Sequence, residues 1–403
     1  MSLVRQYEAQ GVTLTRGEKT GVKPPAVTSR AAIPNARRIV IKVGSSSLTR
    51  PDGHLDLIRV RELSEAIAVC RTRGQEVVLV SSGAQAAAMG PLGLKQKPRT
   101  LSGAQAAASV GQGLLIAEYT RQFAELGYTV GQVLLTAEDV LRKTNYKNAR
   151  RALDELLRLG VVPIVNENDT VATDEIRFGD NDRLAALTAH LIHADVLVLL
   201  TDVDALYDRN PRLPDAKKID VIHSFTEAEQ LDVGSRGSAF GTGGMVTKIQ
   251  AAAIAMSSGV PVLLTSAASV HEALRGEDVG TWFETTATRL PARQLWLAYA
   301  ADIKGRIYVD EGAARAVTDR NASLLPAGVL GSEGNFRVGD AVEIATEDGT
   351  VIARGTAGFS APRIPQIAGL SMNEVEQILE ERYAHEVVHR DELVVMARHR
   401  RTR

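Results

Sequence analysis

Hydrophobic positions between Ile39 and about Ala268 follow two patterns that alternate along the chain. Short runs of aliphatic and β-branched residues occur at 39–43, 77–80, 161–165, 196–200 and 261–264. Between them lie stretches whose apolar residues are three or four positions apart, as in Val60, Leu63 and Ile67. The first pattern is typical of buried strands and the second of amphipathic helices. Their alternation predicts an α/β fold with a mostly parallel sheet between helices.

Polar clusters follow four of the predicted strands, at residues 44–47, 81–83, 166–169 and 201–202. A polar cluster can simply begin a loop. However, the carboxyl ends of parallel strands meet at one edge of the sheet, and ligands of open α/β sheets bind at that edge. Four clusters at the same edge therefore favour a ligand site.

The pattern changes after about Arg289. Short strands are predicted at 305–309, 338–344 and 351–355, separated by glycine, aspartate and asparagine turns, with a plausible hairpin turn at Asp348-Gly349. Residues 1–37 are polar and lack periodicity, which predicts a disordered leader. We therefore expect a leader (1–37), an α/β domain (38–286) and a small β-rich domain (292–396).

Composition narrows the function classes. The chain of 403 residues is 44% apolar and 24% charged, and its net charge is −1, so no overall field attracts nucleic acid or a membrane surface. No apolar run is long enough to span a bilayer. The single cysteine, Cys70, cannot form an internal disulfide. Together these features predict a cytoplasmic protein.

Two glycine-bounded segments carry the candidate chemistry. Residues 179–183 read Gly-Asp-Asn-Asp-Arg, and residues 241–248 read Gly-Thr-Gly-Gly-Met-Val-Thr-Lys before an alanine-rich stretch. A glycine-rich loop that leads into a helix and ends on a lysine suits an anion such as a nucleotide phosphate. The P-loop pattern, zinc-type Cys/His spacing and the G-x-S-x-G motif are all absent. Lys42 and Lys248, with Asp182 to orient them, then predict phosphoryl transfer.

The sequence resembles the glutamate 5-kinase family of the amino-acid kinase superfamily. The resemblance rests on residues 41–46, 80–84, 165–173, 179–183 and 241–248. Within it, Asn-Glu-Asn-Asp at 166–169 followed by Gly-Asp-Asn-Asp at 179–182 is the most specific pair. Residues 309–313, 323–328 and 334–336 resemble the PUA domain attached to bacterial members. The implied architecture is an amino-acid kinase fold followed by a β-rich PUA domain.

The resemblance implies ATP-dependent phosphorylation of the side-chain carboxylate of L-glutamate, the first step of proline synthesis. Lys42 and Lys248 would neutralise the phosphates, with Asp182 orienting both. Glutamate would be bound by Ser82, Asp169 and Asn181, with Asn166 and Asp180 close by. ATP would be bound by Lys42, Thr201, Asp202, Thr242, Gly243, Gly244, Met245, Val246, Thr247 and Lys248.

A carboxyl side chain with an unperturbed pKa of about 4.3 is already ionised at neutral pH, so we expect no catalytic base. We expect Mg²⁺ to be held mainly by ATP oxygens, with no protein metal site. The resemblance further implies proline as a feedback inhibitor, a homo-oligomer (dimer or tetramer) and a glutamyl-phosphate reductase as functional partner.

Three positions depart from the family pattern: Gln85, Gly103-Ala104 and Asn210. The first two lie near the expected glutamate pocket and leave proline inhibition open. One alternative is a related kinase with another small carboxylate, carbamate or nucleotide as acceptor. The other is an RNA-binding protein, because PUA domains occur in such proteins; it requires exposed aromatics such as Tyr308, Phe336 and Phe359 among basic residues.

Overall fold

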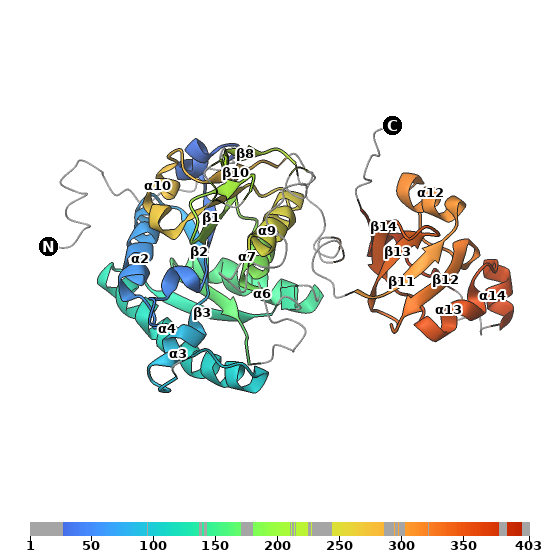
Figure 1. Cartoon of the computed structure of the whole chain (residues 1–403), viewed down its shortest axis with the longest axis horizontal. Coiled ribbons are helices and arrows are strands. Elements are labelled where there is room, and N and C mark those ends of the chain that lie inside the picture. Colours follow the sequence, from blue (N-terminus) through green and yellow to red (C-terminus); the bar gives the residue numbers. More distant parts are fainter. Residues whose placement is uncertain are drawn as a thin grey trace. The chain divides into compact units, whose positions relative to one another are not determined.

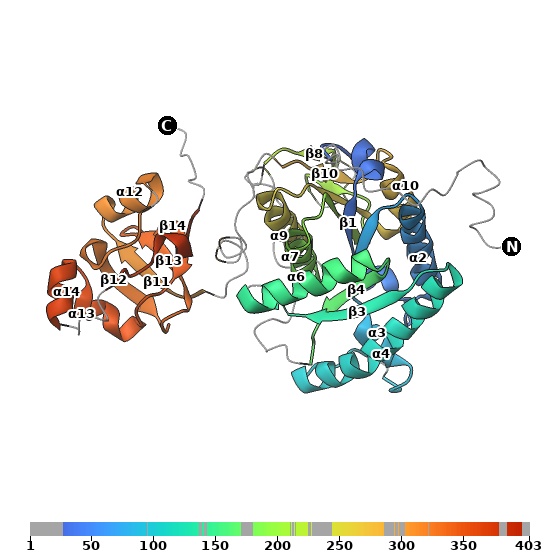
Figure 2. The same cartoon turned by 180° about the vertical axis from the view of Figure 1, so that it is seen from behind.

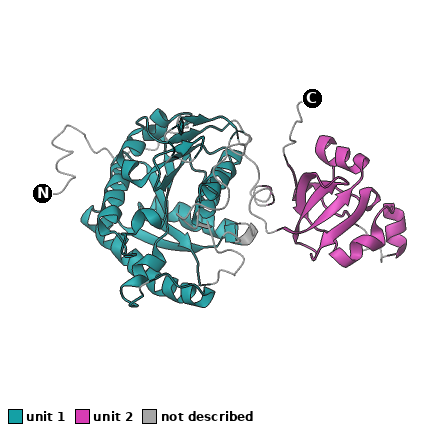
Figure 3. Cartoon of the chain, in the orientation of Figure 1, with its two compact units in different colours: residues 1–289 teal, residues 290–403 magenta. Residues whose placement is uncertain are grey.

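The computed structural model describes most of the chain outside its two ends. The described residues are 27–94, 96–136, 139–140, 143–170, 180–209, 211, 213, 215–224, 227, 244–285, 294, 297, 303–320, 322–378 and 385–396. The chain divides into two compact units, residues 1–289 and residues 290–403 (Figure 3).

The first unit is built on an eight-stranded sheet with the strand order β3-β4-β2-β1-β5-β9-β10-β8. In this spatial order, the six strands β3, β4, β2, β1, β5 and β9 are parallel to one another, whereas β10 is antiparallel to β9. This confirms the predicted mostly parallel sheet. The strands are β1 (Arg38–Val43), β2 (Glu76–Ser81), β3 (Val130–Leu135), β4 (Val162–Glu167), β5 (Val196–Thr201), β8 (Val221–Ile222), β9 (Val262–Ser266) and β10 (Thr281–Phe283).

Helices cover both faces of this sheet (Figures 1 and 2). One face carries α2 (Leu57–Thr72), α4 (Leu101–Glu125) and α10 (Val270–Arg275), whose apolar side chains share a core with Ile39, Ile41 and Val43 of β1. The other face carries α6 (Lys143–Arg158), α7 (Asp180–Leu191) and α9 (Met245–Ser257). Because successive strand residues point to opposite faces, Lys42 projects toward α7.

Shorter elements complete the first unit. The helix α3 (Ala84–Met89) packs against α4, and a two-stranded ribbon joins β6 (Leu206–Tyr207) to β7 (Lys218–Ile219). Single 3₁₀ turns occur at η2 (Ser46–Leu48) and η4 (Ala267–Ser269).

The predicted leader extends too far toward the α/β domain. Residues 27–37 belong to the first unit: η1 (Arg30–Asn35) is a 3₁₀ helix, and Ile33 is completely buried in the core of the sheet. The guanidinium of Arg30 is paired with Asp278 at 2.5 Å and with Asp220 at 2.6 Å. The low hydrophobicity of this segment predicts disorder, but one buried isoleucine and one paired arginine are enough to anchor it.

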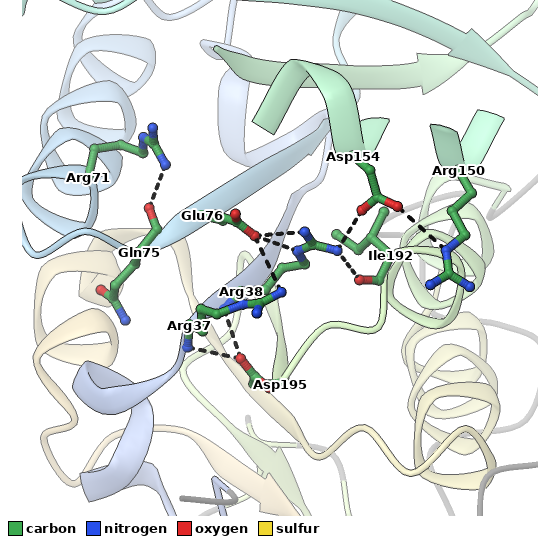
Figure 4. A network of polar contacts seen from close by, with 9 residues as sticks. All are labelled: Arg37, Arg38, Arg71, Gln75, Glu76, Arg150, Asp154, Ile192 and Asp195. Atoms are coloured by element: carbon green, nitrogen blue, oxygen red, sulfur yellow. Dashed lines mark hydrogen bonds and ion pairs between the residues drawn. The ribbon is translucent and has the colours of Figure 1, made fainter. Parts of the chain in front are cut away.

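A polar network joins the elements at the amino-terminal edge of the sheet (Figure 4). The guanidinium of Arg38 on β1 contacts Glu76 of β2 at 2.7 Å and Asp154 of α6 at 2.9 Å, and donates to the carbonyl of Ile192. Asp195 accepts the backbone N–H groups of Arg37 and Arg38. Four segments are thereby held at the edge opposite the polar clusters.

The second unit is a five-stranded sheet with the order β12-β11-β13-β14-β15. Its strands are β11 (Ile303–Val309), β12 (Val329–Gly334), β13 (Ala341–Thr346), β14 (Val351–Thr356) and β15 (Leu393–Val395). One face packs against α12 (Glu311–Arg320), α13 (Ile364–Ile367) and α14 (Met372–Ile378). The turn between β13 and β14 has Gly349 at φ 83°, as the Asp-Gly prediction requires.

Two of the three aromatic residues that the RNA-binding alternative requires to be exposed are buried. Phe336 and Phe359 are buried in the core of this unit, with 1% and 5% of their surface exposed. Bases stack on exposed aromatic faces. Phe336 and Phe359 are therefore unavailable for stacking, whereas Tyr308 of β11 is only partly buried.

Candidate active site

One carboxylate lies between two lysines at the carboxyl edge of the first sheet. Lys42 is the penultimate residue of β1, Asp182 lies in the first turn of α7, and Lys248 lies in the first turn of α9. The Nζ atom of Lys42 is 2.5 Å from Asp182 Oδ1, and the Nζ atom of Lys248 is 3.3 Å from Asp182 Oδ2. The structure thus places the three predicted catalytic residues in contact.

The packing of α7 against α9 explains this arrangement. Both helices begin at the same edge, so their positively polarised N-termini lie near the lysines. Thr247 donates its hydroxyl proton to Asp182 Oδ2 at 2.8 Å, which fixes the first turn of α9 to that of α7. Gly244 is the N-cap of α9 and carries no side chain that could occupy the backbone N–H groups there.

Burial is the largest single influence on the pKa values of both Lys42 and Asp182. It lowers the pKa of Lys42 below its ordinary value; Lys248 acts in the same direction, while Asp182 and Asp202 oppose it. Burial also acts to raise the pKa of Asp182, but the two lysines and the Thr247 hydrogen bond outweigh it, so the net pKa lies below its ordinary value. Asp182 is therefore an ionised anchor at neutral pH.

A second set of polar side chains lies beside this cluster. Asn181 donates from Nδ2 to Ser82 Oγ and to Asn166 Oδ1, both at 3.0 Å. Asn166 Oδ1 also accepts the backbone N–H of Glu167 at 2.8 Å. Ser82 is held in turn by its backbone N–H, which donates to the carbonyl of Val43. Asn181 thus links Ser82 and Asn166 through hydrogen bonds, and all three residues are among those predicted to bind glutamate.

The first turn of α7 separates the two sets. Neighbouring residues of an α-helix point about 100° apart, since 3.6 residues complete one turn. Asn181 consequently faces Ser82 and Asn166, whereas Asp182 faces the two lysines. Asn181 and Asp182 can therefore place a phosphoryl acceptor on one side of α7 beside the lysines that are predicted to bind the phosphoryl group on the other.

The strand β5 ends beside the lysine cluster. Thr201 is its last residue, and its hydroxyl donates to Asp202 Oδ1 at 2.9 Å. Asp202 is near enough to Lys42 to influence its pKa. Met245 and Val246 open α9, and Val246 is half exposed. Thr242 and Gly243 lie outside the described residues, as does the side chain of Asp180, the residue at which α7 begins.

Comparison with known proteins agrees with this arrangement. Residues 37–266 match the amino acid kinase family, and residues 305–379 match the PUA domain. A glutamate 5-kinase from Thermobifida fusca is 54% identical over 370 residues, which cover 91% of this chain and 95% of that protein.

The chain belongs to the glutamate 5-kinase family. Two further members support the assignment. Glutamate 5-kinases from Streptomyces avermitilis and Bifidobacterium longum are 52% and 49% identical, and cover 91% and 93% of this chain and 99% of each relative. The resemblance inferred from the motifs, and the fold that it implies, are therefore confirmed.

Sequence reasoning missed one residue that contacts the side chains predicted to bind the phosphoryl acceptor, here called the acceptor set (Ser82, Asn166, Asp169 and Asn181). Gln112 of α4 donates from Nε2 to the carbonyl of Glu167 at 3.2 Å and to Asp169 Oδ2 at 3.4 Å, and accepts from Asn166 Nδ2 at 3.2 Å. The only sequence signal is that residues 101–117 contain no charged residue, so that a glutamine there is the longest polar side chain available.

Two glycines allow the backbone to approach closely around this set. Gly83, at φ 109°, opens α3 directly after Ser82. Gly111 lies where α4 crosses α3, and a Cβ atom there would be only 1.6 Å from the carbonyl oxygen of Ala84. Any other residue at position 111 would push α4, and Gln112 with it, away from the site.

The donor types in the site fit phosphate better than a protein-held metal. Within the described ranges, no three His, Cys, Asp or Glu side chains are grouped closely enough to hold a metal ion.

Across the described ranges, no helix is both long and apolar enough to cross a membrane.

Proposed function

We propose that this chain transfers the γ-phosphoryl group of ATP to the side-chain carboxylate of L-glutamate, which yields L-glutamyl 5-phosphate and ADP and opens proline synthesis. The observation that carries the proposal is the carboxylate of Asp182, which lies between Lys42 and Lys248 and directly beside the acceptor set. Relatives that cover nearly the whole chain and are named glutamate 5-kinases support it.

The reaction requires positioning more than proton transfer. An oxygen of the glutamate side-chain carboxylate forms a bond to the γ-phosphorus, and the bond from that phosphorus to the bridging oxygen breaks to release ADP. The attacking carboxylate is already ionised at neutral pH, because its unperturbed pKa is about 4.3. The chain therefore has to hold two anions in line and neutralise the charge between them.

The two lysines supply this neutralisation. Lysine is a compact point charge that suits phosphate oxygens. Lys42 approaches from the end of β1 and Lys248 from the first turn of α9, so the two ammonium groups reach the transferred group from different elements. Asp182 fixes both positions in advance, so that no reorganisation is needed during the reaction.

The acceptor set offers groups that can bind both charged ends of glutamate. Ser82, whose hydroxyl oxygen accepts from Asn181, provides an O–H donor for a carboxylate, and Asp169 provides a negative charge for the α-ammonium group. Asn166 and the backbone of Gly83 surround the same region. Because Asn181 is next to Asp182 in the chain, the side-chain carboxylate of glutamate is held near the lysine cluster.

The nucleotide occupies the side of the cluster formed by Thr201, Asp202 and the first turn of α9. Mg²⁺, when bound with ATP, supplies further neutralisation of the phosphates. It would be held mainly by ATP oxygens and water, because Mg²⁺ commonly takes only one or two protein carboxylates at such sites.

The remaining proposals concern regulation and the fate of the product. Proline would compete for the acceptor set, and the chain would act as a dimer or tetramer. The product carries its own α-amine, and intramolecular attack by that amine has a very high effective concentration. A reductase that consumes glutamyl phosphate promptly is therefore the expected functional partner.

The direct test is an acceptor panel. ADP release from ATP should depend on L-glutamate and should be far slower with L-aspartate, N-acetyl-L-glutamate or UMP. The assay is run with and without proline. Faster turnover of any other acceptor would favour a related kinase of the same superfamily and contradict the proposal.

A further inference from the structure

We propose that Gln112 is a positioning residue for the glutamate half of the site. It holds Asn166 and Asp169 in the orientation that binds the acceptor, without touching the reacting atoms. This inference rests on the proposed function. It assigns a role to α4, a helix that contributes none of the residues expected from the sequence.

Both ends of the Gln112 amide are engaged. Its Nε2 atom donates to the carbonyl of Glu167 at 3.2 Å and to Asp169 Oδ2 at 3.4 Å. Its Oε1 atom accepts from Asn166 Nδ2 at 3.2 Å and from Gln132 Nε2 of β3 at 3.5 Å. One side chain thus joins α4, the end of β4, the following loop and β3.

The chemistry of the neighbours fixes the orientation of this amide. The atoms on its Nε2 side, a carbonyl oxygen and a carboxylate oxygen, can only accept. The atoms on its Oε1 side are amide nitrogens, which can only donate. A flipped amide would face acceptor with acceptor and donor with donor, so Gln112 has one favourable orientation and transmits it to Asn166.

From Asn166 the hydrogen bonds continue into the acceptor set. Asn166 accepts from Asn181, and Asn181 donates to Ser82. Gln112 is therefore part of a network of side-chain hydrogen bonds that includes every predicted glutamate-binding side chain for which the structure gives contacts. Asn181, through which these hydrogen bonds pass, faces away from the lysine cluster around Asp182. A change at position 112 should consequently affect glutamate and not ATP.

The backbone of Gln112 is held independently of its side chain. Gly111 packs directly against the first residue of α3. Two turns further along α4, the hydroxyl of the fully buried Tyr119 lies 2.8 Å from Ser81 Oγ, next to Ser82. Removing the amide of Gln112 should therefore leave α4 in place and release only the loop.

The test replaces Gln112 with methionine, which preserves length and helix propensity but cannot form these hydrogen bonds. We expect the KM for glutamate to rise about tenfold, as for the loss of a hydrogen bond to a charged group. The KM for ATP and kcat should stay within about twofold, because uniform acceptor binding is lost and transition-state contacts are not.

Gln122→Met is the matched control on the same helix. Gln122 is buried and donates to Glu118, away from the acceptor set. We expect it to leave both KM values unchanged. A purely structural role for Gln112 would instead lower kcat through loss of folded enzyme, with an unchanged KM for glutamate, and this result would overturn the inference. If Gln112→Met does not fold, Gln112→Asn, shorter by one methylene, should raise the same KM.

A double-mutant cycle with Asp169→Asn tests whether Gln112 acts through Asp169. Coupled residues are not additive, so Gln112→Met should change the KM for glutamate by less than about threefold in the Asp169→Asn background. A full tenfold change there would contradict the inference that Gln112 acts through Asp169. Wild-type enzyme is assayed first: absence of turnover with glutamate would refute the proposed function, whereas normal turnover with an unchanged KM in Gln112→Met would refute this inference alone.

Discussion

Replacing Asp182 with asparagine should make activity fall and stability rise with increasing pH, beginning at a lower pH than in the wild type. The substitution keeps the shape of the side chain but removes the charge that lies 2.5 Å from Lys42 and 3.3 Å from Lys248. The side chains of Lys42 and Asp182 are only 5% and 3% exposed, so water cannot replace the lost partner.

The magnitude follows from the burial of the pair. Removing one member of a buried ion pair typically costs about 3–5 kcal/mol of stability, because the remaining charge is left without compensation. Lys42 can reduce this cost by losing its proton. Burial already lowers its pKa, and Asp182 opposes that effect. Without Asp182 the pKa of Lys42 falls further.

The two pH dependences then have opposite signs. In the variant, folded Lys42 is neutral over a pH range in which unfolded Lys42 is still protonated, so the unfolded state binds more protons and stability rises with pH. Activity requires the protonated lysine and so falls over the same range, beginning at a lower pH than in the wild type. At neutral pH we expect kcat to be reduced about 10²–10³-fold.

The assay measures kcat and the free energy of unfolding in urea from pH 6 to pH 9. Asp154→Asn is the matched control, since Asp154 is paired with Arg38 at the opposite edge of the sheet. It should leave the profile of activity against pH unchanged. Parallel loss of activity and stability with rising pH in Asp182→Asn would refute the reasoning.

Four further outcomes are expected. Lys248→Ala should lower kcat about 10²–10³-fold in a variant that still folds, and wild-type turnover would refute its role. Asn181→Ala should raise the KM for glutamate far more than that for ATP; the reverse would show that the two halves of the site are interchanged. Excess chelator should abolish turnover, and added Mg²⁺ should restore it, whereas full activity in chelator would contradict the need for a divalent ion. Arg38→Met should lower the free energy of unfolding by about 1.5–3 kcal/mol in urea titrations and leave both KM values unchanged; an altered KM would show that this edge reaches the site.

The sequence predicts the parts of the site that follow strands or begin helices. Ser82, Asn166 and Asp169 come directly after aliphatic runs, and Asn181 lies in a glycine-bounded motif. Such residues are visible because their position in the element determines the edge of the sheet at which they lie. The predictions of the α/β sheet and of the β-rich second unit likewise rest on local patterns, namely short apolar runs separated by helical periodicity or by turn residues.

Other features depend on contacts between distant segments. Gln112 precedes Asn166 by 54 residues and lies in the middle of a helix, where no local pattern distinguishes it from a surface glutamine. The strand β3 was not predicted, because as an edge strand it exposes Gln132 and Leu134 and lacks a continuous apolar run. The packed segment 27–37 was assigned to the leader, because its anchoring by Ile33 and Arg30 involves residues far along the chain.

The most direct test of phosphoryl transfer to glutamate follows an oxygen atom. L-Glutamate labelled with ¹⁸O in its side-chain carboxylate is incubated with ATP and enzyme, and the product is allowed to cyclise, so that the amine attacks the acyl carbon and phosphate leaves with the bridging oxygen. The account predicts inorganic phosphate that carries one ¹⁸O atom per ADP formed. Phosphate without the label would mean that water accepts the phosphoryl group, and would contradict the account.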